Sequence, residues 1–169
     1  MQGLRLFLLS VVMRRCAGFL AHQTTRLSSA LASEMPFSAM DIRVGRFVSA
    51  QEHPDSEKLF IEDIDLGEEE PRQIVSGLRA YYSLEQLENQ RCLVVANLPK
   101  AKLAGIESFG MVLCASENDK EKVEFLEPPP TAELGEKVVV EGDDGEPMTS
   151  NQVKKKKVKN IQVEVELFF

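Results

Sequence analysis

The chain has 169 residues, of which 43% are hydrophobic and 28% charged, and its formal net charge is -7. This length and composition are typical of one globular domain with tails. Because no run of eighteen apolar residues occurs, hydropathy predicts no membrane-spanning helix, and we expect no membrane partner.

The charge is distributed unevenly along the chain. Residues 1–33 contain four arginines and no acidic residue, whereas the remaining 136 residues hold 16 basic and 27 acidic side chains. An acid-free segment with arginines, rich in serine and threonine toward its end, is typical of an organellar transit peptide. We therefore predict that residues 1–33 form a transit peptide, disordered or helical, and that the protein resides in a mitochondrion or, alternatively, in a plastid.

Two other interpretations of this leading segment are weaker. A secretory signal would explain the apolar stretch LRLFLLSVV, but two arginines follow it where a small-residue cleavage site is expected. A docked N-terminal helix is disfavoured because arginines interrupt each apolar face.

From residue 40 onward the sequence divides into short β-prone runs separated by turn residues. Each run has about the length of a strand and is rich in Val, Ile, Leu and Phe. The runs comprise residues 40–50, 59–66, 72–78, 91–98, 108–115, 122–127 and 136–140. Seven such runs within about a hundred residues predict a small barrel or sandwich.

One short helix interrupts the series of strands. Ser83 opens the stretch SLEQLEN, and Gln86 follows it at the spacing of a capping box. Three strands, a short helix and two more strands is the order of an OB-fold. We therefore predict an all-β, five-stranded Greek-key barrel over residues 38–142, with the helix between strands 3 and 4 and with extra C-terminal strands.

Residues 143–169 are predicted to form a polar and basic tail. The tail contains the block KKKKVK and ends in NIQVEVELFF, whose alternation is typical of a half-buried strand. No sequence remains to cover such a strand. Either it pairs with the domain or with another subunit, or the chain is a truncated product of a longer gene.

Converging catalytic groups are hard to find. Beyond residue 33 the only histidine is His53, in a turn where packing of its ring on the barrel is the better interpretation. The nucleophile-elbow and nucleotide-binding motifs do not occur, and Asp143 and Asp144 lack the ligand spacing of a calcium loop. Cys92 and Cys114 lie in apolar runs as expected of buried free thiols. We predict no catalytic residue, no metal and no cofactor, and a binding module rather than an enzyme.

The strongest signal for binding is the stretch NLPKAKLAGIESFGMVLCAS, which begins at Asn97. OB barrels bind nucleic acids through one strand face and the loops beside it. Here a strand ends at Asn97, the loop PKAKLAG presents Lys100 and Lys102, and the sheet restarts at Ser108. The plain alternative is a lysine-bearing surface loop, since lysines are nearly always exposed.

Several motifs then occur in a characteristic order. They are D-[IL]-R-[VI]-G at residues 41–45, HP at 53–54, VSGL at 75–78, NL-x-x-AK-x-x-G at 97–105 and S-x-x-M at 108–111. The set resembles the tRNA-binding OB domain appended to methionyl- and tyrosyl-tRNA synthetases. That domain also occurs in stand-alone bacterial tRNA-binding proteins and in the cytokine precursor of the animal multisynthetase complex. The resemblance covers about residues 38 to 160.

The resemblance implies a tRNA-binding accessory protein that recognises shape rather than base sequence and acts in trans with aminoacyl-tRNA synthetases in an organelle. Its partners would be tRNA and a synthetase, with homodimers as in the bacterial relatives. Matched by motif position, the implied tRNA-contacting residues are Asn97, Lys100, Lys102, Ser108 and Met111, with Lys58 and Arg43 as further candidates. The position of Lys58 is often but not always lysine, and Arg43 fits packing or phosphate contact equally well.

Two positions depart from the family pattern. The family commonly has Arg before the loop glycine and Gln or Glu after the serine, and this chain has Ala104 and Phe109 there. One phosphate contact is thereby lost. At the second position, Phe109 replaces a side chain that could hydrogen-bond to base edges with a ring that can stack on a base.

The acidic body opposes RNA at long range. Beyond roughly 8 Å at physiological salt, however, exposed charges act weakly, so their local arrangement matters more than their sum. We predict one basic strip and a modest, steeply salt-dependent affinity. The strip would comprise Lys58, Lys100, Lys102, Lys154 to Lys157 and Lys159. The alternative is a protein-interaction scaffold that docks on a synthetase through its acidic surface, with weak or vestigial RNA binding.

Overall fold

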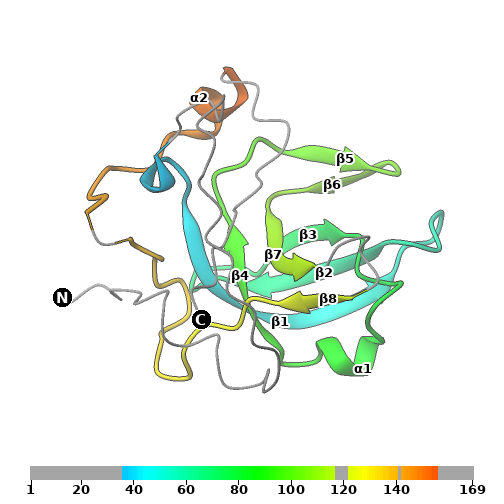
Figure 1. Ribbon diagram of the computed structural model, residues 1–169. Helices are drawn as coiled ribbons and strands as arrows, with labels where there is room; N and C mark the ends of the chain where they lie inside the picture. Colours follow the sequence, from blue (N-terminus) through cyan, green and yellow to red (C-terminus); the bar gives the residue numbers. More distant parts are fainter. Residues whose placement is uncertain (1–35, 117–121, 141, 156–169) are drawn as a thin grey trace, which may run out of the picture.

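The computed structural model describes residues 36–116, 122–140 and 142–155. The predicted transit peptide and the predicted terminal strand lie outside these residues. The strands are β1 (Ile42–Glu52), β2 (Phe60–Asp65), β3 (Arg72–Ser76), β4 (Arg91–Val95), β5 (Ala101–Leu103), β6 (Ile106–Ser108), β7 (Met111–Ser116) and β8 (Val123–Phe125). The helices are α1 (Leu84–Leu87), α2 (Ser150–Lys155) and a 3-10 turn at Phe37–Ala39 (Figure 1).

An antiparallel sheet of six strands in the order β3-β2-β1-β4-β7-β8 forms the body of the molecule, and β5 and β6 form a separate hairpin. The junction between β6 and β7 returns to β3. There the Phe109 N–H donates to the Gln73 carbonyl at 3.0 Å, and the Val75 N–H donates to Ser108 Oγ at 3.0 Å. These bonds close β1, β2, β3, β4 and β7 into a barrel, which confirms the predicted all-β OB-like fold.

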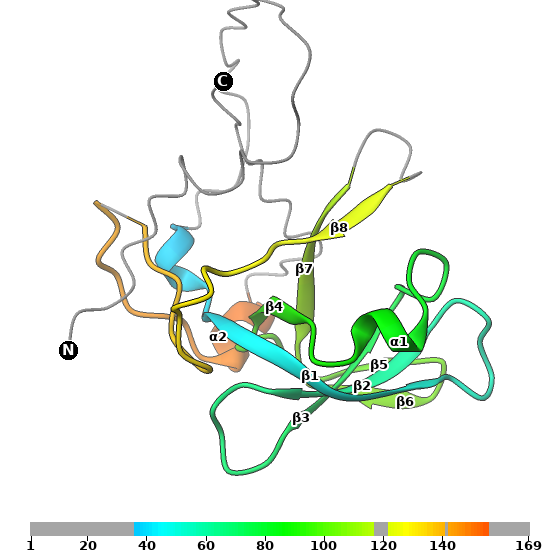
Figure 2. The same ribbon diagram turned by 90° about the horizontal axis from the view of Figure 1, so that it is seen from below.

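Strand β1 serves both halves of the barrel. Its first residues pair with β4, and its later residues pair with β2. A register shift between Phe47 and Ser49 leaves Val48 bulged outward and exposed. A bulge bends a strand and increases its twist, so one continuous strand can turn the corner of a small barrel (Figure 2).

Strand β4 separates two hydrophobic clusters. Cys92 and Val94 point into the barrel interior with Phe47, and Leu93 and Val95 point to the other side, against Met40. The second cluster is covered by residues 126–138, which follow β8. After Arg91, β4 is buried on both faces, and its remaining residues, CLVV, are accordingly all apolar rather than alternating with polar ones.

The short helix lies where the sequence predicts it, between β3 and β4. Ser83 is its N-cap, and the Ser83 N–H donates to Gln86 Oε1 at 2.9 Å, as the capping-box spacing requires. The cap fixes where the chain turns back toward the barrel after β3.

Two predicted strands are wrong in detail. The run 108–115 is not one strand, because Phe109 and Gly110 separate β6 from β7, and part of the predicted loop 99–105 is strand β5. The run 136–140 forms only isolated bridges: the Val44 N–H donates to the Glu136 carbonyl, and the Val138 N–H donates to the Ile42 carbonyl. Both differences arise because a long-range contact, rather than local propensity, sets the backbone direction.

Gly135 provides a test of how this segment is held against the barrel. Its φ is +78°, and a Cβ there would lie 2.3 Å from the Leu66 carbonyl oxygen. We expect Gly135→Ala to lower the free energy of unfolding by about 2 kcal/mol, because both the backbone angle and the space forbid a side chain. Urea denaturation measures the effect. Gly77→Ala, where a Cβ has no neighbour within 4 Å, is the matched control, and equal losses in the two variants would contradict the packing argument.

Candidate nucleic-acid interface

The hairpin of β5 and β6 projects from the barrel beside β3 (Figure 1). Its turn consists of Ala104 and Gly105, whose φ angles are 47° and 92°. Two consecutive positive φ values are typical of the tight turns that match the twist of a β-hairpin. The turn thus needs Gly105 for its backbone, and Ala104 adopts a conformation that is uncommon for a residue other than glycine.

Lys100 and Lys102, predicted from the motif, are both exposed on this hairpin. The Lys100 Nζ lies 2.8 Å from Glu107 Oε1, across the hairpin. The hydrogen bond from Lys100, and its charge together with that of Lys102, lower the pKa of Glu107. Lys100 is therefore an accessible cation whose charge is partly compensated by a neighbour that remains ionised.

Asn97 is buried instead of facing solvent. Its Oδ1 accepts from the Asp41 N–H at 3.0 Å, and its Nδ2 donates to the Ala39 and Met148 carbonyls at 2.9 and 2.8 Å. The carboxamide thus ties the beginning of the fold to the segment before α2. This geometry gives Asn97 a positioning role, and its predicted contact with tRNA stays a prediction.

Ser108 and Met111 also have partners within the protein. Ser108 is 3% exposed, and its hydroxyl accepts from the Val75 N–H and donates to the Gly110 carbonyl. Met111 is half-buried and packs against the second hydrophobic cluster. Both residues hold the junction of β6 and β7 in place, and a direct contact of either with tRNA is likewise untested.

Arg43 belongs to a network of ion pairs. Its guanidinium donates to the Asp41 carboxylate, from Nε at 3.0 and 3.1 Å and from Nη2 at 2.7 Å, and its Nη1 lies 3.5 Å from Glu68. The hydrogen bond to Asp41 is the main reason that the pKa of Arg43 is raised. Glu68 is in turn bound by Arg72 through two hydrogen bonds. The geometry therefore favours the packing role that the sequence left open for Arg43.

Lys58 is exposed in the turn between β1 and β2. That turn and the β5–β6 hairpin lie toward the same end of the barrel in both views (Figures 1 and 2). Lys154 and Lys155 are exposed on α2, and the rest of the predicted basic strip, Lys156, Lys157 and Lys159, lies outside the described residues.

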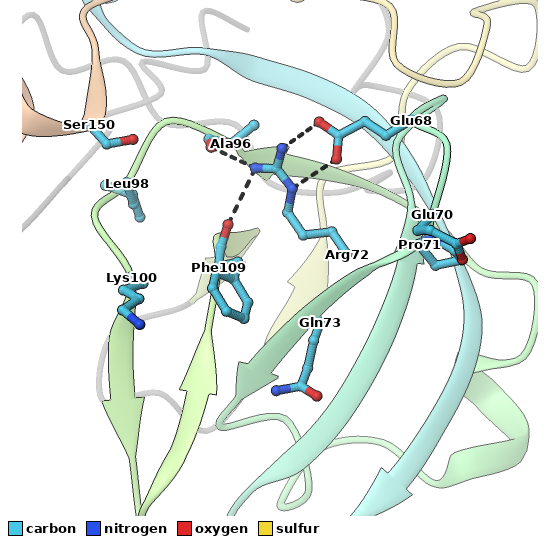
Figure 3. Close-up of a pocket in the computed structure, with 10 residues that line it drawn as sticks. All are labelled: Glu68, Glu70, Pro71, Arg72, Gln73, Ala96, Leu98, Lys100, Phe109 and Ser150. Carbon is cyan, nitrogen blue, oxygen red and sulfur yellow. Dashed lines mark hydrogen bonds and ion pairs between the residues drawn. The ribbon is translucent and has the colours of Figure 1, made fainter.

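An open groove of about 610 Å³ runs beside the hairpin, between the start of β3, the chain after β4 and the junction of β6 and β7. Figure 3 shows its walls, with Lys100 on one side, Glu70 and Pro71 on the other, and Phe109 and Gln73 between them. The Arg72 guanidinium donates to the Ala96 carbonyl at 2.6 Å and to the Phe109 carbonyl at 3.3 Å. These bonds fix the groove floor.

Sequence reasoning missed Arg72 and Gln73 as groove residues. They begin a strand, and nothing in RQIVSGL signals a site. The signal lies in contacts across the barrel: Gln73 Nε2 donates to the Glu107 carbonyl at 2.7 Å, 34 residues away. Phe109, which departs from the family pattern, lines the groove.

Other chemistry is sparse in the described part of the chain. His53 is buried, as its packing interpretation requires, and its Nδ1 accepts from the Asp55 N–H at 3.1 Å. Cys92 and Cys114 are free thiols, and burial raises the pKa of both. Residues 36–116, 122–140 and 142–155 contain no cluster of side chains suited to a metal ion. Within the same residues, every helix is too short or too polar to cross a membrane.

Comparisons with known proteins identify the domain. A family model described as a putative tRNA binding domain matches residues 42–137. The cytoplasmic tyrosine–tRNA ligase of Danio rerio is 46% identical over 132 residues, which cover 77% of this chain and 25% of the ligase. Aminoacyl tRNA synthase complex-interacting multifunctional protein 1 of Cricetulus griseus is 39% identical over 134 residues, covering 79% of this chain and 37% of that protein.

A solved structure supports the same assignment. The C-terminal domain of Plasmodium vivax p43 superposes with a TM-score of 0.62 at 37% identity, covering 67% of this chain and 68% of that one. The chain spans only about a quarter of the tyrosine–tRNA ligase, so the similarity concerns one domain and not the whole ligase. Since the family model matches more than half of the chain, this protein belongs to the family of putative tRNA-binding domains.

Proposed function

We propose that this protein is a tRNA-binding accessory protein that acts in trans with an aminoacyl-tRNA synthetase, without catalytic activity of its own. The observation that supports the proposal most is the exposed pair Lys100 and Lys102 on a hairpin beside the groove of an OB-like barrel. Exposed cations beside a groove on this fold suit a phosphate backbone. The relatives' names, tyrosine–tRNA ligase and synthase complex-interacting protein, are consistent with tRNA and a synthetase as partners.

The chemistry of the groove favours shape recognition over base reading. Its floor is occupied by hydrogen bonds within the protein. The accessible cations at the groove and beside it are Lys100, which lines it, and Lys102 on the hairpin, and a lysine acts on phosphate as a point charge. Such contacts set register on the backbone and carry little base information. We therefore expect this protein to bind tRNA with modest affinity and with little dependence on base sequence.

The test measures tRNA binding at several salt concentrations with residues 34–169, which omit the predicted transit peptide. For Lys100→Ala with Lys102→Ala we expect about a tenfold loss of affinity and a salt slope reduced by about 1 to 2, one for each lost phosphate contact. The matched control is Lys122→Ala with Lys137→Ala, which removes the same charge outside the groove lining. If Lys100→Ala with Lys102→Ala leaves the tRNA affinity and its dependence on salt unchanged, the proposed binding site is wrong.

A second candidate function has its own support. Glu107 partly compensates Lys100, and Glu68 compensates both Arg43 and Arg72, which weakens the field offered to a polyanion. The acidic turn Glu68 to Glu70 is exposed and suits a basic partner protein. A scaffold that docks on a synthetase would co-purify with it after nuclease treatment. Loss of the synthetase on RNA digestion would instead favour tRNA binding.

The proposal places the protein in a mitochondrion, with a plastid as the alternative, and this part rests on the composition of residues 1–33 alone. Fusion of residues 1–33 to a fluorescent reporter tests it directly. We expect the fusion to be imported. When the four arginines are replaced by glutamine, we expect the reporter to stay outside organelles.

A further inference from the structure

Phe109 is unusual among the apolar side chains of the barrel. With 39% of its surface exposed it is one of three large hydrophobic side chains exposed among the described residues, and it alone of these lines the groove. Its backbone is held on both sides, since the N–H donates to the Gln73 carbonyl at 3.0 Å and the carbonyl accepts from Arg72 at 3.3 Å. The ring is thus presented from a fixed support, which lowers the ordering cost of binding a ligand against it.

A cation stands beside this ring. In Figure 3 Lys100 lies on one side of Phe109 and Gln73 on the other. The side chain of Lys100 is 64% exposed and is held by a carboxylate that water also reaches. A surface ion pair of this kind contributes little stability, so a phosphate can replace the carboxylate at small cost.

The two ends of the groove differ in charge. At the far end the Glu68 carboxylate is bound by Arg43 and Arg72, so those arginines are not free for an anion, and Glu70 is exposed at the rim. Among the described residues that line the groove, Lys100 at the hairpin end is therefore the accessible cation for a phosphate. This polarity orients a nucleotide with its phosphate toward Lys100 and its base over the ring.

We propose that this groove binds one unpaired nucleotide, whose base stacks on Phe109 while Lys100 exchanges Glu107 for the nucleotide's phosphate. The proposal rests on the proposed RNA-binding function and deepens it, because it names the part of the RNA that the groove takes. A paired base inside a helix has its faces covered by its neighbours, whereas an unpaired base can be splayed out onto an aromatic ring. The groove, at about 610 Å³, has the size of a small-ligand site.

The experiment uses residues 34–169 and two probes, a tRNA and a short single-stranded RNA carrying 2-aminopurine. Stacking on the ring should quench 2-aminopurine fluorescence. We expect Phe109→Ala to abolish the quenching and to weaken oligonucleotide binding by about 5- to 100-fold, the range typical of one base–aromatic stack. Phe109→Tyr should retain both. Tyr81→Ala, an exposed aromatic outside the groove lining, is the matched control and should bind as the unmodified chain does.

The outcomes separate this inference from the proposed function. If the unmodified chain binds tRNA and Phe109→Ala binds each probe as tightly as the unmodified chain does, the stacking inference is overturned and the proposed function stands. If the unmodified chain binds the oligonucleotide with quenching but does not bind tRNA, the nucleotide site stands and the proposed function fails. Competition by duplex RNA as strong as by single-stranded RNA would also overturn the inference. Circular dichroism verifies that each variant is folded.

Glu107→Gln tests the phosphate position separately. Removing the competing carboxylate should raise the affinity for the single-stranded probe by about 2- to 5-fold at low salt, with the gain shrinking as salt is added. Glu124→Gln, which lies outside the groove lining and removes the same charge, is the control. A loss of affinity in Glu107→Gln would contradict the exchange of partners at Lys100.

Discussion

Glu62→Gln is expected to stabilise the barrel at alkaline pH and to flatten the dependence of its stability on pH. Glu62 lies in β2 and is 0% exposed. The Ser76 hydroxyl donates to its Oε1, while Oε2 is buried with no partner. Burial raises the pKa of this carboxyl to about 8, and the hydrogen bond from Ser76 opposes the shift only in part.

The sign of the effect follows from which state holds the proton. Below pH 4.5 the carboxyl is protonated in both states, so burial carries no ionisation cost. As the pH rises toward 8, the unfolded chain loses its proton while the folded barrel keeps it, and the barrel is destabilised. At about 1.4 kcal/mol per pH unit, this loss amounts to about 3 kcal/mol at pH 7. Above pH 8 it no longer grows.

Urea denaturation at pH 5 and pH 8 measures the prediction. Between these values the unmodified chain should lose about 3 kcal/mol more stability than Glu62→Gln, because glutamine does not titrate. At pH 5 the variant should be slightly the less stable of the two, since its additional N–H is buried without a partner. Glu69→Gln, in the exposed turn after β2, is the control and should stay within about 0.5 kcal/mol of the unmodified chain. Parallel curves for Glu62→Gln and the unmodified chain would contradict the buried ionisation.

Asn97→Ala is expected to cost about 3 kcal/mol of unfolding free energy. The substitution removes three hydrogen bonds at once and leaves the Asp41 N–H buried without its acceptor, whereas the Ala39 carbonyl still accepts from the Met148 N–H at 3.0 Å. It also frees the Met148 carbonyl, which holds the segment before α2. The loss should therefore appear both in denaturation and as faster amide exchange at residues 36–41 and 148–155.

The matched control for this variant is Asn151→Ala, which changes an exposed asparagine on α2. It should change stability by no more than about 0.5 kcal/mol. If Asn97→Ala is as stable as the control but has lost tRNA binding, Asn97 is a contact residue, as its motif implies, and not a structural clamp. Reduced stability together with unchanged affinity per folded molecule would establish the positioning role.

Local patterns carried most of the fold prediction. Alternating and continuous apolar runs located β1 to β4, β7 and β8, and the Ser83–Gln86 spacing located α1, because strand burial and helix capping depend on neighbours along the chain. The strand predicted at residues 136–140 was wrong because its conformation depends on residues far away along the chain. Its Val residues favour a strand, but the backbone meets β1 for only a few residues around an isolated bridge at Lys137.

The sequence by itself determined the family, the order of strands and helix along the chain, and the exposure of Lys100 and Lys102. Ordered motifs and charged side chains can be recognised along the chain without a structure. Only the tertiary structure decided that Asn97 and Ser108 point inward and that Arg72 and Gln73 line the groove with Phe109. The physical reason is barrel closure: a hydrogen bond such as Gln73 to Glu107 joins residues 34 positions apart. No periodicity along the chain encodes which side chains such a contact brings together.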